Sequence, residues 1–361
     1  MSAAMQKEGR NMIQILSKVF NLSLIYATFR AATPIIYATL CASVTQQADI
    51  LNIGTEGIML VGAYFAVIVS YFTGSWFLGI LAAMAAGLAI SMIMAVGHIR
   101  FGADICGIGM GINMFALAIT KFLIQAMFGQ NGSFSSPDIV PIPKVHIPVF
   151  DHVEVLNELF NNWNLLEWFV IALIAILYFF IYKTVWGLRL RAVGQFAEAA
   201  KTAAINVNAV KYRAMASSGL IGGLAGAHLS LGYSSQFVEN MTSSRGFMGV
   251  AAMFFGGANP VKSSLGCLLF GFADSVGARL QAYGLPSQFV LMMPYIVTII
   301  VLAISMATKL SISRRKQSAL ISADSAKRRA HAVREKGARE RSFPGMQRVE
   351  RRAGDKMLWF V

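Results

Sequence analysis

Long runs of apolar residues alternate along this chain with short polar breaks. The runs cover residues 53–72, 76–96, 105–128, 163–182, 214–233, 264–283 and 288–307. A helix rises 1.5 Å per residue and the hydrocarbon core of a bilayer is about 30 Å thick, so about 20 apolar residues suffice to span it. The pattern therefore predicts an all-α, polytopic membrane protein.

Two stretches depart from this regular pattern. Residues 11–44 are apolar but are interrupted by Arg30 and by Thr33-Pro34, which predicts one or two segments, broken or tilted at the proline. Residues 246–257 are too few to span a bilayer and predict a half-helix. Together with the full spans, these stretches predict roughly eight to ten transmembrane or half-membrane helices, some of them broken.

Charge is distributed unevenly between the polar loops. Residues 129–162 carry four prolines and several acidic residues against the single Lys144, which indicates an external loop. Residues 183–213 carry six Lys and Arg against Glu198 alone. The positive-inside rule places this second loop in the cytoplasm, and the one span between the loops makes the two assignments consistent.

The composition is typical of a membrane protein, and the distribution of charge distinguishes a basic tail from the rest of the chain. Hydrophobic residues make up 56% of the 361 residues and charged residues 13%, far from the balance of a soluble domain. Of the net charge of +14, most lies beyond residue 308, where 15 Lys and Arg face 5 Asp and Glu. We therefore predict a transmembrane domain over residues 1–310 and a disordered, basic cytoplasmic tail over residues 311–361, in contact with anionic lipid at most. Nothing in it resembles a nucleic-acid-reading module, so no nucleic-acid partner is predicted.

Sequence motifs for catalysis are missing. There is no phosphate-binding GxxxxGK[ST] loop, no HExxH or GxSxG motif and no metal-binding spacing of Cys and His. The three cysteines (Cys41, Cys106 and Cys267) lie in apolar stretches and are interpreted as packing residues. The chain is therefore not expected to be an enzyme or to hold a metal or cofactor.

Polar residues inside the spans are the candidates for function. Asn52 and Glu56 open the stretch NIGTEGIMLVGA, Asn113 lies in the middle of a span, and Asp274 lies near the middle of another, five positions before Arg279. Intramembrane polar groups either join helices or line a polar pathway, and the sequence leaves both roles open. The loop charges predict that Glu56 lies near the cytoplasmic entrance, as a gate or packing residue, and they favour Asp274 for the pathway itself.

Two further features concern helix contacts. The span over residues 214–233 carries four small residues at helical spacing, which predicts close packing against a neighbouring helix: Gly219, Gly222, Gly223 and Gly226. The cytoplasmic loop contains EAAKTAA from Glu198, a strong helix former between two spans. This helix is either an ordinary connector or a surface presented to a cytoplasmic partner, as a transporter without its own ATPase motif requires.

Five stretches resemble one family of transporters: NIGTEGIMLVGA (52–63), ADICGIGMGINMFALAIT (103–120), the EAA-like loop, RGFMGVAAMFFGGANP (245–260) and LLFGFADSVGARLQ (268–281). They are similar to the membrane subunits of bacterial ATP-binding-cassette (ABC) importers. The similar branch is the branched-chain amino acid and ribose type of permease, and within it the shorter permease of the simple-sugar and nucleoside subgroup. The resemblance covers residues 22–308.

The resemblance implies a multi-pass subunit of the bacterial inner membrane, with its C-terminus in the cytoplasm, that translocates nucleosides or related simple sugars. It implies a second permease subunit in a homo- or heterodimer, separate ATPase subunits that bind ATP and Mg²⁺, and an extracytoplasmic substrate-binding protein. The coupling helix of the family maps onto residues 194–205, and its residues here would be Gly194, Glu198, Ala199, Ala200 and Ile205. Ala204 stands where the family usually has glycine.

Other functions remain alternatives. A permease for branched-chain amino acids or another sugar would share the same scaffold. A stand-alone secondary transporter would need an ion-coupling site, for which the spans offer few acidic residues. A membrane scaffold with a nucleic-acid-binding tail would show salt-dependent binding by residues 311–361.

Overall fold

The structure, a computed structural model, describes residues 22–146, 161, 163–282 and the isolated positions 292, 296, 299, 300 and 303. The chain divides into two compact units, residues 1–300 and 301–361, and the named helices and strands belong to the first. The predicted tail, its boundary at residue 310 and nearly all of the predicted span 288–307 lie outside the described residues.

The described part of the chain is built from helices, with two very short strands. Six of its helices are long and apolar enough to cross a membrane, and α11 is a shorter apolar helix, so the prediction of an all-α polytopic protein is confirmed. The elements are α2 (Leu22–Gln46), α3 (Thr55–Thr73), α4 (Trp76–Ile99), α5 (Ile105–Phe128), β1 (Ser133–Phe134), α7 (Leu165–Lys183), α8 (Val185–Gln195), α9 (Ala197–Thr202), α10 (Val207–Ala227), η2 (His228–Ser234), β2 (Phe237–Val238), α11 (Arg245–Phe255) and α12 (Pro260–Ala282).

The predicted break at Pro34 does not occur. Helix α2 runs without interruption through Pro34, although the proline has no N–H to donate to the carbonyl of Arg30. The preceding residue, Thr33, donates its hydroxyl to the Phe29 carbonyl at 2.8 Å and so strengthens the same turn. Helix α2 packs against α10, α11 and α12 along its length. This packing outweighs the local preference of the proline, which the sequence pattern could not indicate.

Helices α2, α3 and α10 form the buried centre, and α4, α5 and α7 keep apolar faces exposed, as expected for contact with lipid. The glycines of α10 make the central packing close. A Cβ on Gly222 would lie 2.6 Å from the Ile58 side chain of α3, and one on Gly219 would lie 2.6 Å from the Gly87 carbonyl of α4. Cβ atoms on Gly223 and Gly226 would overlap backbone carbonyls of Ala83 and Met59.

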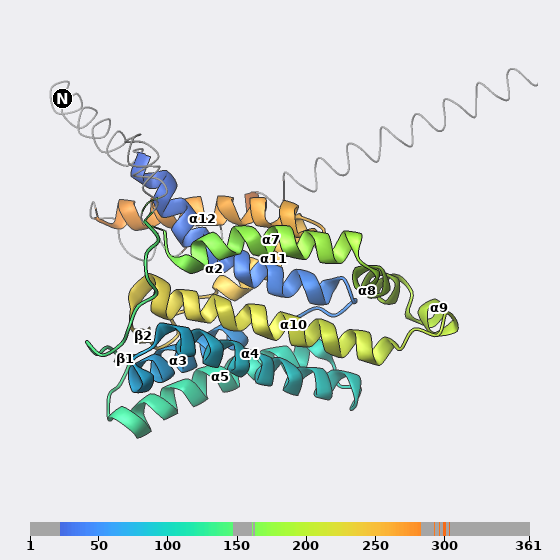
Figure 1. Cartoon of the computed structure of the whole chain (residues 1–361), viewed down its shortest axis with the longest axis horizontal. Coiled ribbons are helices and arrows are strands. Elements are labelled where there is room, and N and C mark those ends of the chain that lie inside the picture. Colours follow the sequence, from blue (N-terminus) through green and yellow to red (C-terminus); the bar gives the residue numbers. More distant parts are fainter. Residues whose placement is uncertain are drawn as a thin grey trace, which may run out of the picture. The chain divides into compact units, whose positions relative to one another are not determined.

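The bundle has two distinct ends. Strands β1 and β2 pair antiparallel, with Phe134 opposite Phe237, and thereby join the loop after α5 to the segment after η2. Helices α8 and α9 lie at the opposite end of the bundle (Figure 1). We call these the strand end and the α9 end. Because α7 connects them, the described part of the acidic loop (residues 129–146) and the basic loop lie at opposite ends of the bundle.

Candidate transport pathway and coupling loop

The half-helix predicted over residues 246–257 is α11, which has 11 residues. The first N–H groups of any helix lack partners within the helix and carry partial positive charge. Here Glu56 supplies the partner from α3: its Oε1 accepts the Ser244 N–H at 2.9 Å, and its Oε2 accepts the Gly246 N–H at 2.7 Å. Glu56 is buried. A carboxylate from one helix thus caps the N-terminus of another.

The backbone around this cap is shaped to bring the two helices together. Ser243 and Ser244 both adopt positive φ, at 45° and 66°, which turns the chain into α11. A Cβ on Gly246 would lie 2.6 Å from Glu56 Oε2 and 2.7 Å from the Glu56 backbone. Only glycine fits at this position with α3 and α11 in contact.

Glu56 lies at the first turn of α11, at the far end of this helix from the α9 end. Helix α11 runs from Glu56 toward the α9 end, where the Ala258 carbonyl accepts from the Gln47 side chain at 2.9 Å. Eleven helical residues span about 16 Å, roughly half of the hydrocarbon thickness. The expected place of Glu56 near a cytoplasmic entrance stays a prediction. Residues 50–52 enter the bundle in non-helical form, so α3 begins inside it.

Two asparagines fix the start of α3. The Asn113 side chain of α5 accepts the Gly57 N–H at 2.8 Å and donates to the Ile53 carbonyl at 3.0 Å, so it satisfies backbone groups at the beginning of α3. Asn52 is fully buried and donates to the Ser218 hydroxyl of α10 at 2.9 Å. Both side chains therefore join helices, and they hold the helix that carries Glu56.

Asp274 finds its partner on the capped half-helix. The Arg245 guanidinium, at the first residue of α11, lies 3.2 Å from Asp274 Oδ2 of α12, and both side chains are partly exposed. Arg279 instead donates to the Ser23 hydroxyl of α2 at 2.7 Å. As the spacing along the helix indicates, Asp274 and Arg279 do not pair with each other. Glu56, Arg245 and Asp274 thus form a chain of contacts across α3, α11 and α12.

The loop between α7 and α10 forms two short helices at the α9 end. Helix α9 carries Glu198, which pairs with Lys201 at 2.8 Å on the exposed face, while Ala200 is buried. The carbonyl of the exposed Ala199 accepts the Ala203 N–H, and the Ile205 N–H donates to the Ala200 carbonyl.

One contact links this loop to the half-helix. A Cβ on Gly194, near the end of α8, would overlap the carbonyl oxygen of Gln47, so α8 lies directly on the turn that follows α2. Because the Gln47 side chain bonds to the Ala258 carbonyl beyond α11, a continuous set of contacts connects α8 and α9 to α11 and its cap.

Ala204, which closes α9, has a left-handed backbone with φ of 57°. This conformation costs a residue with a Cβ about 1 kcal/mol relative to glycine. We expect Ala204→Gly to raise the free energy of unfolding by up to about 1 kcal/mol without changing transport. The measurement is thermal unfolding of the purified protein. The control is Ala203→Gly, where φ is −82° and glycine should give no gain; equal effects of the two variants would contradict the assignment.

A buried polar cluster near the strand end was not among the predicted site residues. Glu167 of α7 lies 3.4 Å from the His228 ring of η2, with their side chains 3% and 0% exposed. Glu167 also accepts the Asn164 N–H at 2.9 Å as part of a capping box, and Tyr37 donates to the Leu166 carbonyl at 2.7 Å. The sequence signal was an acidic residue in the first turn of a span, but its partner lies 61 positions away.

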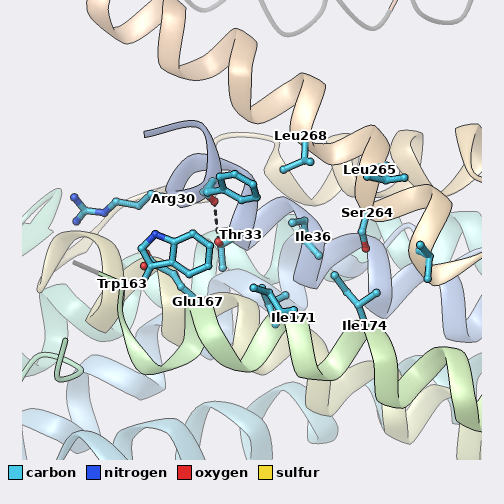
Figure 2. Close-up of a pocket in the computed structure, with 13 residues that line it drawn as sticks. Arg30, Thr33, Ile36, Trp163, Glu167, Ile171, Ile174, Ser264, Leu265 and Leu268 are labelled. Carbon is cyan, nitrogen blue, oxygen red and sulfur yellow. Dashed lines mark hydrogen bonds between the residues drawn. The ribbon is translucent and has the colours of Figure 1, made fainter. Parts of the chain in front are cut away.

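The described part of the chain also contains an apolar cavity of about 160 Å³ between α2, α7 and α12. Figure 2 shows Ile36, Ile171 and Leu268 among the side chains that surround it, with the Arg30 guanidinium extending away from them. The lining offers a polar solute few hydrogen bonds. This cavity therefore suits hydrocarbon rather than a hydrophilic cargo.

Comparison with known proteins places the chain in a family. The family of permease components of branched-chain amino acid transport systems matches residues 24–302, and the chain belongs to it. It is similar to the guanosine ABC transporter permease protein NupQ of Bacillus subtilis (strain 168), with 35% identity over 304 residues that cover 81% of this chain and 93% of that protein. It is also similar to the nucleoside ABC transporter permease protein NupC of Lactococcus lactis subsp. cremoris (strain MG1363), with 33% identity over 305 residues that cover 81% and 94%. The chain is therefore a multi-pass permease subunit of an ABC importer.

Proposed function

We propose that this chain translocates nucleosides, or closely related sugar-like solutes, across the bacterial cytoplasmic membrane. The observation that carries the proposal is that two relatives, each matched over more than nine tenths of its length, are named as guanosine and nucleoside permeases. Branched-chain amino acids or other sugars are the alternative cargo, since the family name refers to amino acids.

The energy for transport comes from separate ATPase subunits, which bind ATP and Mg²⁺ at the α9 end. The exposed α9 is the contact surface for them, with Glu198, Ala199 and Ala200 on the helix and Gly194 and Ile205 at its flanks. Support comes from the contacts of Gly194 with Gln47 and of Gln47 with Ala258, by which a displacement of α9 can reach α11. The half-helix carries Arg245, so its movement changes the Arg245–Asp274 pair.

The partners follow from the same assignment. A second permease subunit, identical or related, completes the pathway, and an extracytoplasmic binding protein delivers the solute at the strand end. The α9 end, with its six Lys and Arg in residues 183–213, faces the cytoplasm, and so does the basic tail. Neither a nucleic acid nor a cofactor bound to this chain is part of the proposal.

The test is reconstitution of the permease with its ATPase, second permease and binding protein in proteoliposomes. We expect uptake of tritiated guanosine that requires ATP, with much weaker uptake of leucine. The chain alone should move neither solute under a proton or sodium gradient. Gradient-driven uptake by the chain alone would instead identify a secondary carrier, and ATP-driven uptake of leucine but not guanosine would identify an amino acid permease.

A further inference from the structure

A second cavity, of about 300 Å³, lies between α2, α12 and the end of η2, and its lining combines charged and hydroxyl groups with alanines and tyrosine rings. The charged groups around it are Arg30, Asp274 and Arg279, accompanied by Tyr26 and Tyr233. Tyr233 lies just before β2, so the cavity is in the half of the bundle toward the strand end. Its volume is at the lower limit of ligand pockets, about 300 Å³. It is thus large enough for a small polar solute.

Two buried polar atoms in this lining have no hydrogen-bond partner within the described part of the chain: the Ser275 hydroxyl oxygen and Arg30 Nε. Ser275 is only 5% exposed. Buried polar groups are nearly always paired, and an unpaired one costs about 1–3 kcal/mol. Most serines in helices bond to the preceding turn, as Ser264 does on the same helix by donating to the Pro260 carbonyl at 2.7 Å. The unpaired Ser275 hydroxyl therefore indicates a place for a ligand.

The remaining contacts of the charged groups leave further bonding capacity. Arg30 donates through Nη2 to the Tyr233 carbonyl at 2.9 Å and lies over the Tyr233 ring at 4.7 Å, which holds the guanidinium in place. Asp274 accepts a hydrogen bond from Arg245 at Oδ2, while Oδ1 makes no hydrogen bond within the described residues. A ligand at the cavity would thus meet an acceptor at Asp274, a donor at Arg30 and a hydroxyl at Ser275.

The lining carries both signs of charge, which bears on the class of ligand. The cavity is lined by the positive Arg30 and Arg279 and by the negative Asp274, which also pairs with Arg245 at 3.2 Å. A ligand whose groups both donate and accept hydrogen bonds can use such a mixture of donors and acceptors. The cavity also contains no leucine, isoleucine, valine or phenylalanine; its apolar surface comes from three alanines and the rings of Tyr26 and Tyr233.

We propose that this cavity binds the ribose of the transported nucleoside, with neighbouring hydroxyls of the sugar bonded to Asp274 Oδ1 and the Ser275 hydroxyl and Arg30 Nε donating to a sugar oxygen. Neighbouring hydroxyls both donate and accept, which matches this mixture of groups. The inference rests on the proposed function, since it assigns the part of the nucleoside that this subunit contacts. It makes Ser275 a determinant of selectivity for hydroxylated sugars.

The experiment compares Ser275→Ala with Ser264→Ala in the reconstituted complex, always with the same binding protein, so that differences between variants come from the permease. The substrates are tritiated guanosine and 2′,3′-dideoxyguanosine. We expect Ser275→Ala to reduce guanosine uptake about fivefold, the loss of one hydrogen bond, and to leave dideoxyguanosine uptake within about twofold. Ser264→Ala should affect both substrates equally, because its hydroxyl bonds only within α12.

The outcomes separate this inference from the proposed function. If Ser275→Ala and Ser264→Ala change guanosine transport to the same extent, or if neither changes it, the proposed ribose site is wrong. The assignment as a nucleoside permease would not be affected. A complex that transports leucine and no nucleoside would overturn the proposed function, and the inference with it. Thermal unfolding of both variants serves as the folding control, since neither hydroxyl supports a contact between helices.

Discussion

We expect Glu56→Ala to abolish uptake and to loosen the half-helix, because α11 loses the carboxylate that caps its N-terminus. The two lost bonds, to the N–H groups of Ser244 and Gly246, are charge-assisted and buried, so removal should cost about 3 kcal/mol or more. Arg245 begins α11, so its pairing with Asp274 should weaken as well. The measurements are guanosine uptake in proteoliposomes and amide hydrogen exchange over residues 244–255, which should accelerate in the variant.

The matched control is Glu239→Ala, which removes an exposed ion pair with Lys121 at the strand end. Such surface pairs contribute about 0–1 kcal/mol, so neither uptake nor hydrogen exchange in α11 should change. Glu56→Gln keeps one acceptor oxygen. Its guanosine uptake and its hydrogen-exchange rate in α11 should lie between those of the wild type and of Glu56→Ala. If amide hydrogens of α11 exchanged at the wild-type rate in Glu56→Ala and guanosine uptake were normal, the role assigned to the cap would be wrong.

Periodicity and charge predicted the elements of this protein well because they act locally. The short run at 246–257 predicted a half-helix, and α11 is one. The basic loop 183–213 and the acidic loop 129–162 were predicted on opposite sides, and the described parts of the two loops lie at opposite ends of the bundle. The glycines of residues 219–226 predicted a closely packed helix, and α10 approaches carbonyls of its neighbours at these positions.

The contacts of the site could not be predicted in the same way, because they join residues far apart in the sequence. Glu56 is a recognisable intramembrane carboxylate, but its partners lie 188 and 190 positions later. The non-helical residues 50–52 place the start of α3 inside the bundle, which the apolar run from residue 53 does not indicate. The unpaired Ser275 resembles any helical serine until its neighbours are known.

The contacts of Gly194 with Gln47 and of Gln47 with Ala258 link the loop of α8 and α9 to α11, which neither segment indicates alone. Because α11 is anchored at one end to the turn after α2 and at the other end to Glu56, it is held at both ends. A short helix fixed in this way is displaced as a unit when either anchor moves. If the proposed coupling role of α9 holds, we expect a change at the α9 end to block transport without altering Glu56, Arg245 or Asp274.

Gly194→Ala tests this link and should uncouple ATP hydrolysis from transport. The added Cβ overlaps the Gln47 carbonyl, so α8 must move away from the turn at a cost of about 1–3 kcal/mol. We expect the complex to retain ATP hydrolysis while the guanosine moved per ATP falls about tenfold. Gly111→Ala is the control, since nothing lies within 4 Å of a Cβ there and alanine favours the helix. If Gly194→Ala moves as much guanosine per ATP as the wild type, the link through Gln47 is not required. Motion would then reach α11 by another route.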